Sequence, residues 1–376
     1  MCLRVRLRNV IKKNRDEFSS LFFCYRLFLS AKIWYNEIRR FFILKKILIT
    51  GGAGYLGLNM AVSLLSKGYS IVIVDDLKNA FEMHINRLIE NFESKVTFYQ
   101  GNVCDREFMK GVFETHKFDI VIHLAAHKYV GESITKPQEY FDNNIGSLET
   151  VLELAEKFQV KKLAFASSAV VYGNTESVPT SESVKFAPIS PYAETKCIGE
   201  DMIQKWCQKS GVSAVIFRFS NPVGANTKYM FGDHSKKGVE NLLPYIVRSA
   251  IKDKAMVFRG NNHATPDGTP IRDYISIVDL AEIVAEVLSS AQTEQCEVIN
   301  VGRGAGFSLL QIVRAVESEL EKSVQYSFSK RSNLEASVSM LDVSKLHSRY
   351  QVEVKHDLKD IVKSQVEFFK YLNNKK

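Results

Sequence analysis

The sequence predicts an α/β protein built on a parallel sheet with helices on both faces, followed by a smaller mixed α/β lobe. The first observation is an apolar run at residues 47–50 that meets Gly51, Gly54 and Gly57, after which residues 58–65 carry apolar side chains at helical spacing. The second is an apolar run at residues 70–74 that ends at Asp75. The third is a regular alternation of short apolar runs with helical patterns, which is typical of parallel strands joined by right-handed crossovers.

The three glycines suit a tight turn between a strand and a helix that binds a dinucleotide. One glycine permits the turn, one lets the backbone approach a pyrophosphate, and one lets the helix pack on the strand. The N–H groups and the dipole at the helix start attract the phosphates. Asp75 lies about twenty residues further on, where a carboxylate accepts hydrogen bonds from the adenosine ribose. The stretch predicts a Rossmann-type domain that binds NAD rather than NADP; the alternative is a glycine-rich turn without a ligand.

Length and charge limit the possible classes of protein. A chain of 376 residues suits one or two domains with a large core. Residues 1–46 hold twelve Lys/Arg and three Asp/Glu, a net charge of +9, which leaves −1 for the rest of a chain whose total is +8. A nearly neutral body gives no support to nucleic-acid binding. The six cysteines show no metal-ligand spacing, so we predict a reduced cytoplasmic protein without a metal site.

Residues 1–45 form a basic and aromatic N-terminal extension. Arg26 and Lys32 interrupt its apolar run and no small-residue cleavage site follows, so the pattern predicts neither a membrane span nor a signal peptide. Three interpretations remain: an amphipathic segment in peripheral contact with an anionic membrane, a segment that packs on the body or on a partner, and a start assigned too far upstream. A later start would need a codon other than Met, because Met60 lies inside the first expected helix.

The alternation of strands and helices continues along the chain. Further strands are expected at 96–100, 118–123 and 162–165, and helices at 105–115 and 137–158. Beyond residue 225 we expect helices at 239–251, 277–291, 308–320 and 357–372, and strands at 256–258, 271–277, 297–301 and 324–328. We therefore predict a Rossmann domain over residues 46–225, to which 271–305 contribute, and mainly a substrate-binding lobe over 226–376. Ligands of such sheets lie at the carboxyl ends of the strands.

Candidate catalytic residues fall at one of those strand ends. Ser168 follows the expected strand 162–165, and Tyr192 and Lys196 share one face at the start of a helix. An ammonium group beside a phenol stabilises the phenolate and lowers its pKa, so Tyr192 can act as a base on a substrate hydroxyl that Ser168 also contacts. A nicotinamide would take the hydride from the carbon. We predict that these residues dehydrogenate an alcohol, although a Tyr and a Lys at this spacing alone are more often a surface pair.

The motifs together resemble those of the extended short-chain dehydrogenases/reductases, and most closely the UDP-glucose 4-epimerases among the nucleotide-sugar epimerases. The resemblance covers residues 46 to about 320. Ala169 and Val170 stand where the related dehydratases carry an acidic pair. The matching stretches are TGGAGYLG (50–57), HKYVGES (127–133), YFDNN (140–144), SSAVVYG (167–173), SPYAETK (190–196), NPVGA (221–225), NLLPY (241–245) and DGTPIRDYISIVDL (267–280).

The resemblance implies roles for particular residues. It implies Tyr192, Lys196 and Ser168 as catalytic residues, and Arg272 as a bidentate phosphate clamp. The residues implied to bind NAD are Gly51, Gly54, Tyr55, Leu56, Gly57, Asp75, Asp76, Asn79, Ala80, Asn102, Val103, Leu124, Ala125, Ala126, Lys128, Asn143, Tyr192, Lys196 and Ser220. Those implied to bind the substrate are Lys128, Ser168, Tyr192, Asn221, Asn241, Leu242, Arg272 and Arg331.

The implied function is an NAD-dependent nucleotide-sugar 4-epimerase. In that family the sugar passes hydride from C4 to NAD, turns over as a 4-keto sugar and receives hydride on its other face, so NAD can stay tightly bound. The implied substrates are UDP-glucose and UDP-galactose, or the N-acetylhexosamine pair, and the implied assembly is a homodimer. The chain departs from the family pattern at Ser220 and Arg259, which replace aromatic residues, and at 331–335, which lack a glycine. Ser339 has a small side chain at a position where, in that family, the size of the side chain governs the acceptance of 2-N-acetyl sugars.

Two other functions stay open. The first is a nucleotide-sugar dehydratase or reductase of the same superfamily, which shares the redox residues. The second is a non-catalytic NAD-binding or membrane-scaffold protein, in which residues 1–45 would be the working part. Intact Tyr192 and Lys196 argue against the second.

Overall fold

The computed structural model describes residues 45–238, 241–290, 294–331 and 336–374. Residues 46–376 form one compact unit. The membrane contact proposed for the N-terminal extension falls on residues outside the described ones. None of the described helices is both long and apolar enough to cross a bilayer.

The centre of this unit is a sheet of seven strands, in which every neighbouring pair runs parallel. The carboxyl ends of all seven strands therefore meet at one edge. In spatial order the strands are β12 (Cys296–Val301), β6 (Ser213–Phe219), β5 (Lys162–Ser168), β4 (Ile120–His123), β1 (Lys46–Thr50), β2 (Ser70–Asp75) and β3 (Val96–Gln100).

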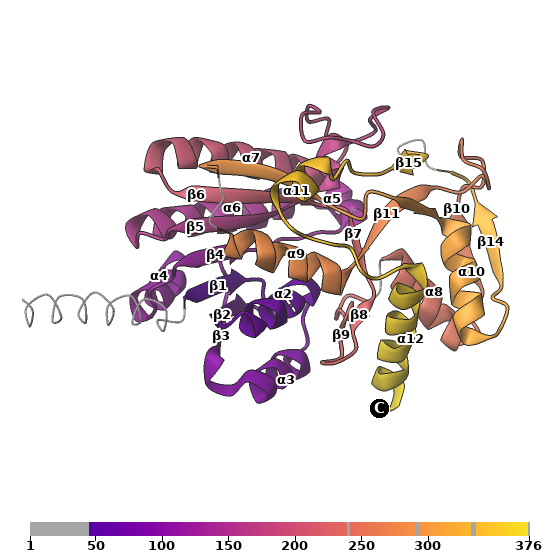
Figure 1. The fold of residues 1–376 in the computed structure, drawn as a ribbon, viewed down its shortest axis with the longest axis horizontal. Coiled ribbons are helices and arrows are strands. Elements are labelled where there is room, and N and C mark those ends of the chain that lie inside the picture. Colours follow the sequence, from indigo (N-terminus) through magenta and orange to yellow (C-terminus); the bar gives the residue numbers. More distant parts are fainter. Residues whose placement is uncertain (1–44, 239–240, 291–293, 332–335, 375–376) are drawn as a thin grey trace, which may run out of the picture. The chain divides into compact units, whose positions relative to one another are not determined.

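Helices cover both faces of this sheet (Figure 1), each over its own hydrophobic core. Successive strand side chains point to opposite faces, so Ile47 and Ile49 pack in one core and Leu48 in the other. On the first face lie α2 (Tyr55–Ser66), α3 (Glu82–Phe92) and α9 (Ile277–Ser289). On the second lie α4 (Arg106–Thr115), α6 (Pro137–Lys157) and α7 (Pro191–Ser210). The predicted doubly covered parallel sheet is confirmed.

A third core lies among the later elements, which form smaller sheets and helices. Helices α8 (Leu242–Ile251), α10 (Leu309–Leu320) and α12 (Leu358–Asn374) pack around it. Strand β10 (Met256–Arg259) pairs with β14 (Tyr326–Ser329). Strand β11 (Ile271–Ser276) pairs with β7 (Asn221–Val223), β13 (Gly306–Ser308) and β15 (Val338–Ser339). The remaining short elements are η1 (Glu93–Lys95), α5 (Val130–Thr135), η2 (Ala169–Tyr172), β8 (Ala225–Asn226), β9 (Phe231–Gly232) and α11 (Ser344–Arg349).

Several elements differ from the expectations. Strand β6 and helices α3 and α5 were not predicted, although β6 is an almost wholly buried run beside β5. The strand predicted at 324–328 lies two residues later, and that predicted at 162–165 continues to Ser168. Strand β12 joins the edge of the parallel sheet, and α9 covers one of its faces. The division of the chain near residue 225 stays a prediction.

Candidate active site

The glycine-rich turn joins β1 to α2 as a close backbone crossing. Gly51 adopts a φ of +68°, and a Cβ there would lie 2.7 Å from the amide nitrogen of Ala125. Gly54 is the N-cap residue of α2, and no side chain caps that helix. Its first N–H groups are thus available to a ligand anion at the positive end of the helix dipole. The turn fits a dinucleotide pyrophosphate.

Gly57 is required because α2 packs directly on the turn. A Cβ at Gly57 would lie 2.4 Å from Gly52 Cα, and this contact is with backbone that cannot swing away. We expect Gly57→Ala to displace the helix start, so that the purified protein carries little NAD and melts at a lower temperature. Absorbance of the extracted dinucleotide and a thermal scan measure both effects. Gly111→Ala is the matched control, since a Cβ there meets nothing within 4 Å; equal NAD content in the two variants would contradict the role of Gly57.

The end of β2 provides the polar groups predicted for the adenosine ribose. The Asp75 carboxylate accepts hydrogen bonds from Ala53 N at 3.2 Å and Leu77 N at 2.9 Å, which ties it to the glycine turn. Burial raises the pKa of Asp75, and these two N–H donors oppose the rise. Among the described residues, the buried Oδ1 atom of Asn79 has no hydrogen-bond partner. A ligand hydroxyl group at this place would satisfy that acceptor, so the residues fit the ribose of NAD.

The other predicted cofactor residues follow neighbouring strands at the same edge. Asn102 and Val103 come after β3, residues 124–128 come after β4, and Asn143 lies on α6. Asp76 forms an ion pair with Lys78 at 3.0 Å. Ala80 and Val103 are buried. The Lys128 ammonium group lies over the Tyr129 ring, with Nζ 5.4 Å from the ring centroid. Ser220 follows β6 and donates its N–H to Val301 O at 2.9 Å. The structure thus gathers at one edge the residues that follow β1, β2, β3, β4 and β6.

Tyr55 differs from the expectation in one respect. Its hydroxyl group donates to Gly224 O at 2.7 Å, and burial raises its pKa well above the ordinary value. The side chain is therefore committed to another segment of the protein. Only the backbone N–H groups of Tyr55 and Leu56 remain to contact a pyrophosphate.

Ser168, Tyr192 and Lys196 converge at the carboxyl end of β5. Ser168 is the last residue of that strand and lies close enough to the Tyr192 phenol to lower its pKa. Lys196 is 4% exposed and lies on the same face of α7, with its Nζ atom 5.8 Å from the Tyr192 ring centroid. The Lys196 ammonium group donates to Ala166 O at 2.7 Å and lies 4.8 Å from the Phe165 ring. The predicted group is brought together, and a cation is held beside the phenol.

The sequence predicts a lowered pKa for the Tyr192 phenol. This prediction is wrong when only the side chains of the protein act on the phenol. Burial raises its pKa to about 12, and the hydrogen bond with Ser168 opposes the rise. Burial also lowers the pKa of Lys196 to about 8, while Glu200 acts in the opposite direction. Desolvation therefore outweighs the attraction between the two side chains, because Lys196 is buried and Tyr192 is half-buried. A phenolate at Tyr192 needs further positive charge beside the ring, which an oxidised nicotinamide supplies when bound.

A buried ion pair lies directly behind Lys196, and the sequence analysis missed it. Glu200 is fully buried one helical turn beyond Lys196, and the Arg218 guanidinium group donates to it at 3.0, 3.1 and 2.7 Å. Ser167 donates a further hydrogen bond to Glu200, and Arg218 donates to the Tyr172 hydroxyl group at 2.9 Å. The signal in the sequence is the repeat of polar residues at 192, 196 and 200, which places all three on one helix face.

His123 ends β4 close to this group and stays neutral. It hydrogen-bonds with Thr50 Oγ1 at 2.8 Å, and burial, assisted by the charge of Lys196, lowers its pKa to about 3. The unfolded chain takes up this proton near pH 6.5 and the folded chain only near pH 3, so acid favours unfolding. We expect the free energy of unfolding to fall by about 2 kcal/mol from this group alone between pH 6.5 and 5. Urea titrations at several pH values should show a shallower fall for His123→Asn; equal slopes would contradict this role.

Of the residues predicted to bind the substrate, Asn221 lies on β7, Arg272 on the neighbouring β11, and Asn241 and Leu242 at the start of α8. Asn221 Nδ2 donates to Asp273 O at 2.9 Å. Asn241 is the N-cap residue of α8, but its side-chain amide donates to Asp233 Oδ2 and makes no capping hydrogen bond to the helix. Leu242 begins α8 and packs against the third core. Arg272 donates to its neighbour Ile271 O at 2.8 Å and pairs in register with Ser339.

Arg331 lies two residues beyond the end of β14. It donates to Ser337 Oγ at 3.3 Å, and its Cβ atom lies close to Gly260. The rest of the predicted phosphate motif, 332–335, is outside the described residues. Asp273 accepts hydrogen bonds from the N–H groups of Arg303 and Gly304 at 2.8 and 3.2 Å, so it fixes the loop that follows β12.

Comparisons with known proteins identify the family of this chain. The family model for the NAD dependent epimerase/dehydratase family matches residues 47–302. The chain is 35% identical over 320 residues to a UDP-glucose 4-epimerase of Dictyostelium discoideum, covering 84% of this chain and 93% of that protein.

Two solved structures share the fold. The UDP-glucose 4-epimerase of Bifidobacterium longum in complex with NAD+ and UDP superimposes with a TM-score of 0.84 at 32% identity, covering 88% of this chain and 99% of that one. That of Stenotrophomonas maltophila, with bound NAD and formylated UDP-arabinopyranose, gives 0.84 at 31% identity over 88% of this chain and 100% of that one. With its glycine turn, its ribose-side carboxylate and its Ser-Tyr-Lys group at one sheet edge, the chain belongs to the NAD dependent epimerase/dehydratase family.

Proposed function

We propose that this protein is an NAD-dependent nucleotide-sugar 4-epimerase that acts on UDP-glucose and UDP-galactose or on the corresponding N-acetylhexosamine pair. The observation that carries the proposal is the convergence of Ser168, Tyr192 and Lys196 at the same sheet edge as the glycine turn. UDP-sugar chemistry is supported by the relatives and solved structures described above. The small Ser339 beside Arg272 supports acceptance of the larger N-acetyl sugars.

The side chains of the protein transfer a single proton, that of the sugar 4-hydroxyl group. Tyr192 accepts the proton of the sugar 4-hydroxyl group as the 4-keto sugar forms, and returns it when the hydroxyl group is restored. Ser168 donates a hydrogen bond to the same oxygen atom, and the Lys196 ammonium group stabilises the phenolate. Bound NAD would supply a reversible hydride acceptor beside the sugar C4, so that no cofactor would be consumed. Arg272 and Arg331 supply cations for the diphosphate, and Asn221, Asn241 and Leu242 surround the nucleotide.

A direct assay tests the reaction. The purified full chain is incubated separately with UDP-glucose, UDP-galactose, UDP-GlcNAc and UDP-GalNAc, without added NAD, and the products are separated by chromatography. We expect the C4 epimer of at least one of these sugars and no lasting NADH. Absence of an epimer from all four would overturn the proposal, while a 4-keto-6-deoxy product or sustained NADH turnover would indicate the dehydratase or reductase instead.

We also propose a homodimeric cytoplasmic enzyme, as the family resemblance implies. Light scattering of the purified chain measures the assembly, and a monomeric mass would contradict it. Peripheral membrane contact through residues 1–45 stays a prediction. Co-sedimentation of the full chain with anionic vesicles, compared with neutral ones, tests it, since a basic segment should prefer the anionic surface.

A further inference from the structure

A segment of residues 233–238, here called the strap, follows β9 and attaches to two separate parts of the sheet edge. The chain just before it is held at α2: Asn59 Nδ2 donates to Phe231 O at 3.5 Å and Tyr55 donates to Gly224 O at 2.7 Å. Helix α2 begins at the glycine turn, so the chain that leads into the strap contacts the first turns of the helix that follows the predicted pyrophosphate site.

On one side the strap is bound to the loop after β2. Lys236 N donates to Asn79 O at 2.9 Å, and Lys236 Nζ donates to Leu77 O at 2.8 Å. His234 hydrogen-bonds with His84 of α3 at 3.0 Å and stacks on Phe81. These contacts involve main-chain groups and stacked rings, and they hold the strap to the segment assigned to the adenosine ribose.

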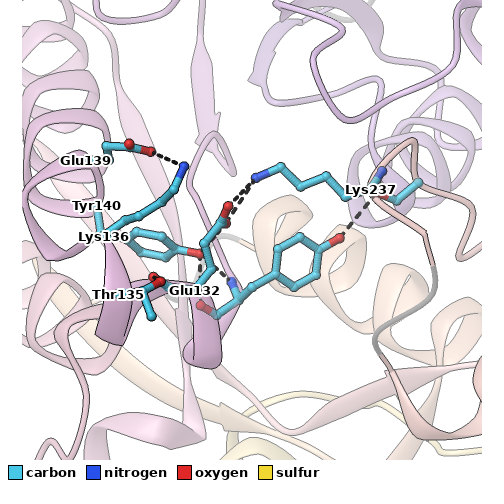
Figure 2. Close-up of polar contacts among 8 residues, drawn as sticks. Glu132, Thr135, Lys136, Glu139, Tyr140 and Lys237 are labelled. Carbon is cyan, nitrogen blue, oxygen red and sulfur yellow. Dashed lines mark hydrogen bonds and ion pairs between the residues drawn. The ribbon is translucent and has the colours of Figure 1, made fainter.

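On the other side the strap is bound to the segment after β4. Figure 2 shows Lys237 reaching the Glu132 carboxylate, with Nζ–O distances of 2.9 and 3.0 Å. Tyr129 and Ser235 hydrogen-bond at 3.2 Å, and Lys237 Nζ lies 5.8 Å from the Tyr129 ring centroid. Glu132 is fixed in turn by the Tyr140 hydroxyl group, which donates to it at 3.0 Å. The pairing lowers the pKa of Glu132, so the carboxylate stays charged.

The order of the strands shows what lies between these two attachments. Strand β1 lies between β4 and β2, and its carboxyl end carries the glycine turn. The strap therefore joins the segments on either side of the turn that fits the pyrophosphate. We propose that the strap retains NAD in its site, and that the Lys237–Glu132 ion pair is the latch that opens when NAD exchanges. The inference rests on the proposed NAD site.

The ion pair is the weaker of the two attachments. The side chains of Lys237 and Glu132 are 38% and 27% exposed, and half-exposed ion pairs contribute little and are screened by salt. The attachment to Asn79 and Leu77 uses backbone carbonyl groups that salt does not screen in this way. Opening should thus begin at Glu132, and cofactor exchange should depend on ionic strength.

The test measures exchange of the bound dinucleotide rather than turnover. The full chain is loaded with NAD and mixed with excess deuterium-labelled NAD, and the bound fraction is followed by mass spectrometry at low and high NaCl. We expect Lys237→Met, which keeps the length and removes the charge, to exchange up to about fivefold faster at low salt. Salt should accelerate exchange in the native chain and leave this variant almost unchanged.

Two further variants make the result specific. Lys136→Met removes a neighbouring ion pair, 3.2 Å from Glu139, that does not touch the strap, so it should exchange like the native chain. Lys237→Arg keeps the charge and should restore slow, salt-sensitive exchange. Native exchange rates and salt response in Lys237→Met would overturn the proposal, as would equal acceleration by Lys136→Met. The readout needs no nucleotide sugar, so a chain that exchanges NAD through the latch yet epimerises nothing would contradict only the proposed reaction.

Discussion

Replacement of Tyr192 by Phe is expected to lower kcat by about 10³-fold, because the variant has no group to exchange a proton with the sugar 4-hydroxyl group. The ring is kept, so its packing against Tyr140, with a centroid distance of 6.5 Å, and the position of Lys196 should persist. Chromatographic product assays at saturating UDP-sugar measure kcat, and the extracted dinucleotide shows whether NAD is retained. We expect normal NAD content with almost no turnover.

Tyr172→Phe is the matched control for that variant. Tyr172 is also buried, its pKa is raised by burial to about 12, and its hydroxyl group donates to Asn300 Oδ1 at 2.6 Å. Loss of this hydroxyl group should lower the free energy of unfolding by about 1 kcal/mol and leave kcat within a fewfold of the native value. If Tyr192→Phe retained turnover, or if both variants lost it equally, Tyr192 would not be the proton-transferring group.

The second large effect concerns the buried Glu200–Arg218 pair. Glu200→Leu should lower the free energy of unfolding by about 3–5 kcal/mol, because it leaves a guanidinium group buried without its carboxylate. Both side chains are almost fully buried, at 0% and 4% exposure, so water cannot replace the lost partner. Urea unfolding followed by circular dichroism measures the change.

A double variant separates the ion pair from packing in general. Glu200→Leu combined with Arg218→Met removes both charges, and it should recover part of the stability that the single variant loses. Lys67→Met is the surface control: its pair with Glu286 is 36% and 44% exposed, so its loss should change stability by less than about 1 kcal/mol. The single variant Arg218→Met completes the cycle. If Arg218→Met lowered the free energy of unfolding equally in the native chain and in Glu200→Leu, the two side chains would not be coupled.

The correct predictions concern features that are local in the chain. A strand, three glycines and a helix follow one another without interruption over residues 46–66, so backbone geometry alone relates them. Tyr192 and Lys196 are one helical turn apart, and helix geometry places them on one face. The alternation of apolar runs with helical patterns then implies that all the strand ends meet at one edge. Strand β6 was not predicted although its apolar run, residues 214–217, is equally local.

Tertiary structure decided the electrostatics and the closure of the site. The Tyr192 pKa is raised because segments distant in the sequence enclose the ring, and the spacing of Tyr192 and Lys196 says nothing about that desolvation. Arg218 meets Glu200 because β6 packs beneath α7, and Lys237 meets Glu132 across 105 residues of sequence. The sequence by itself determined which groups the chain places at the sheet edge. Packing between distant segments decided their solvation and charge partners, because desolvation and ion pairing depend on neighbours that no local pattern specifies.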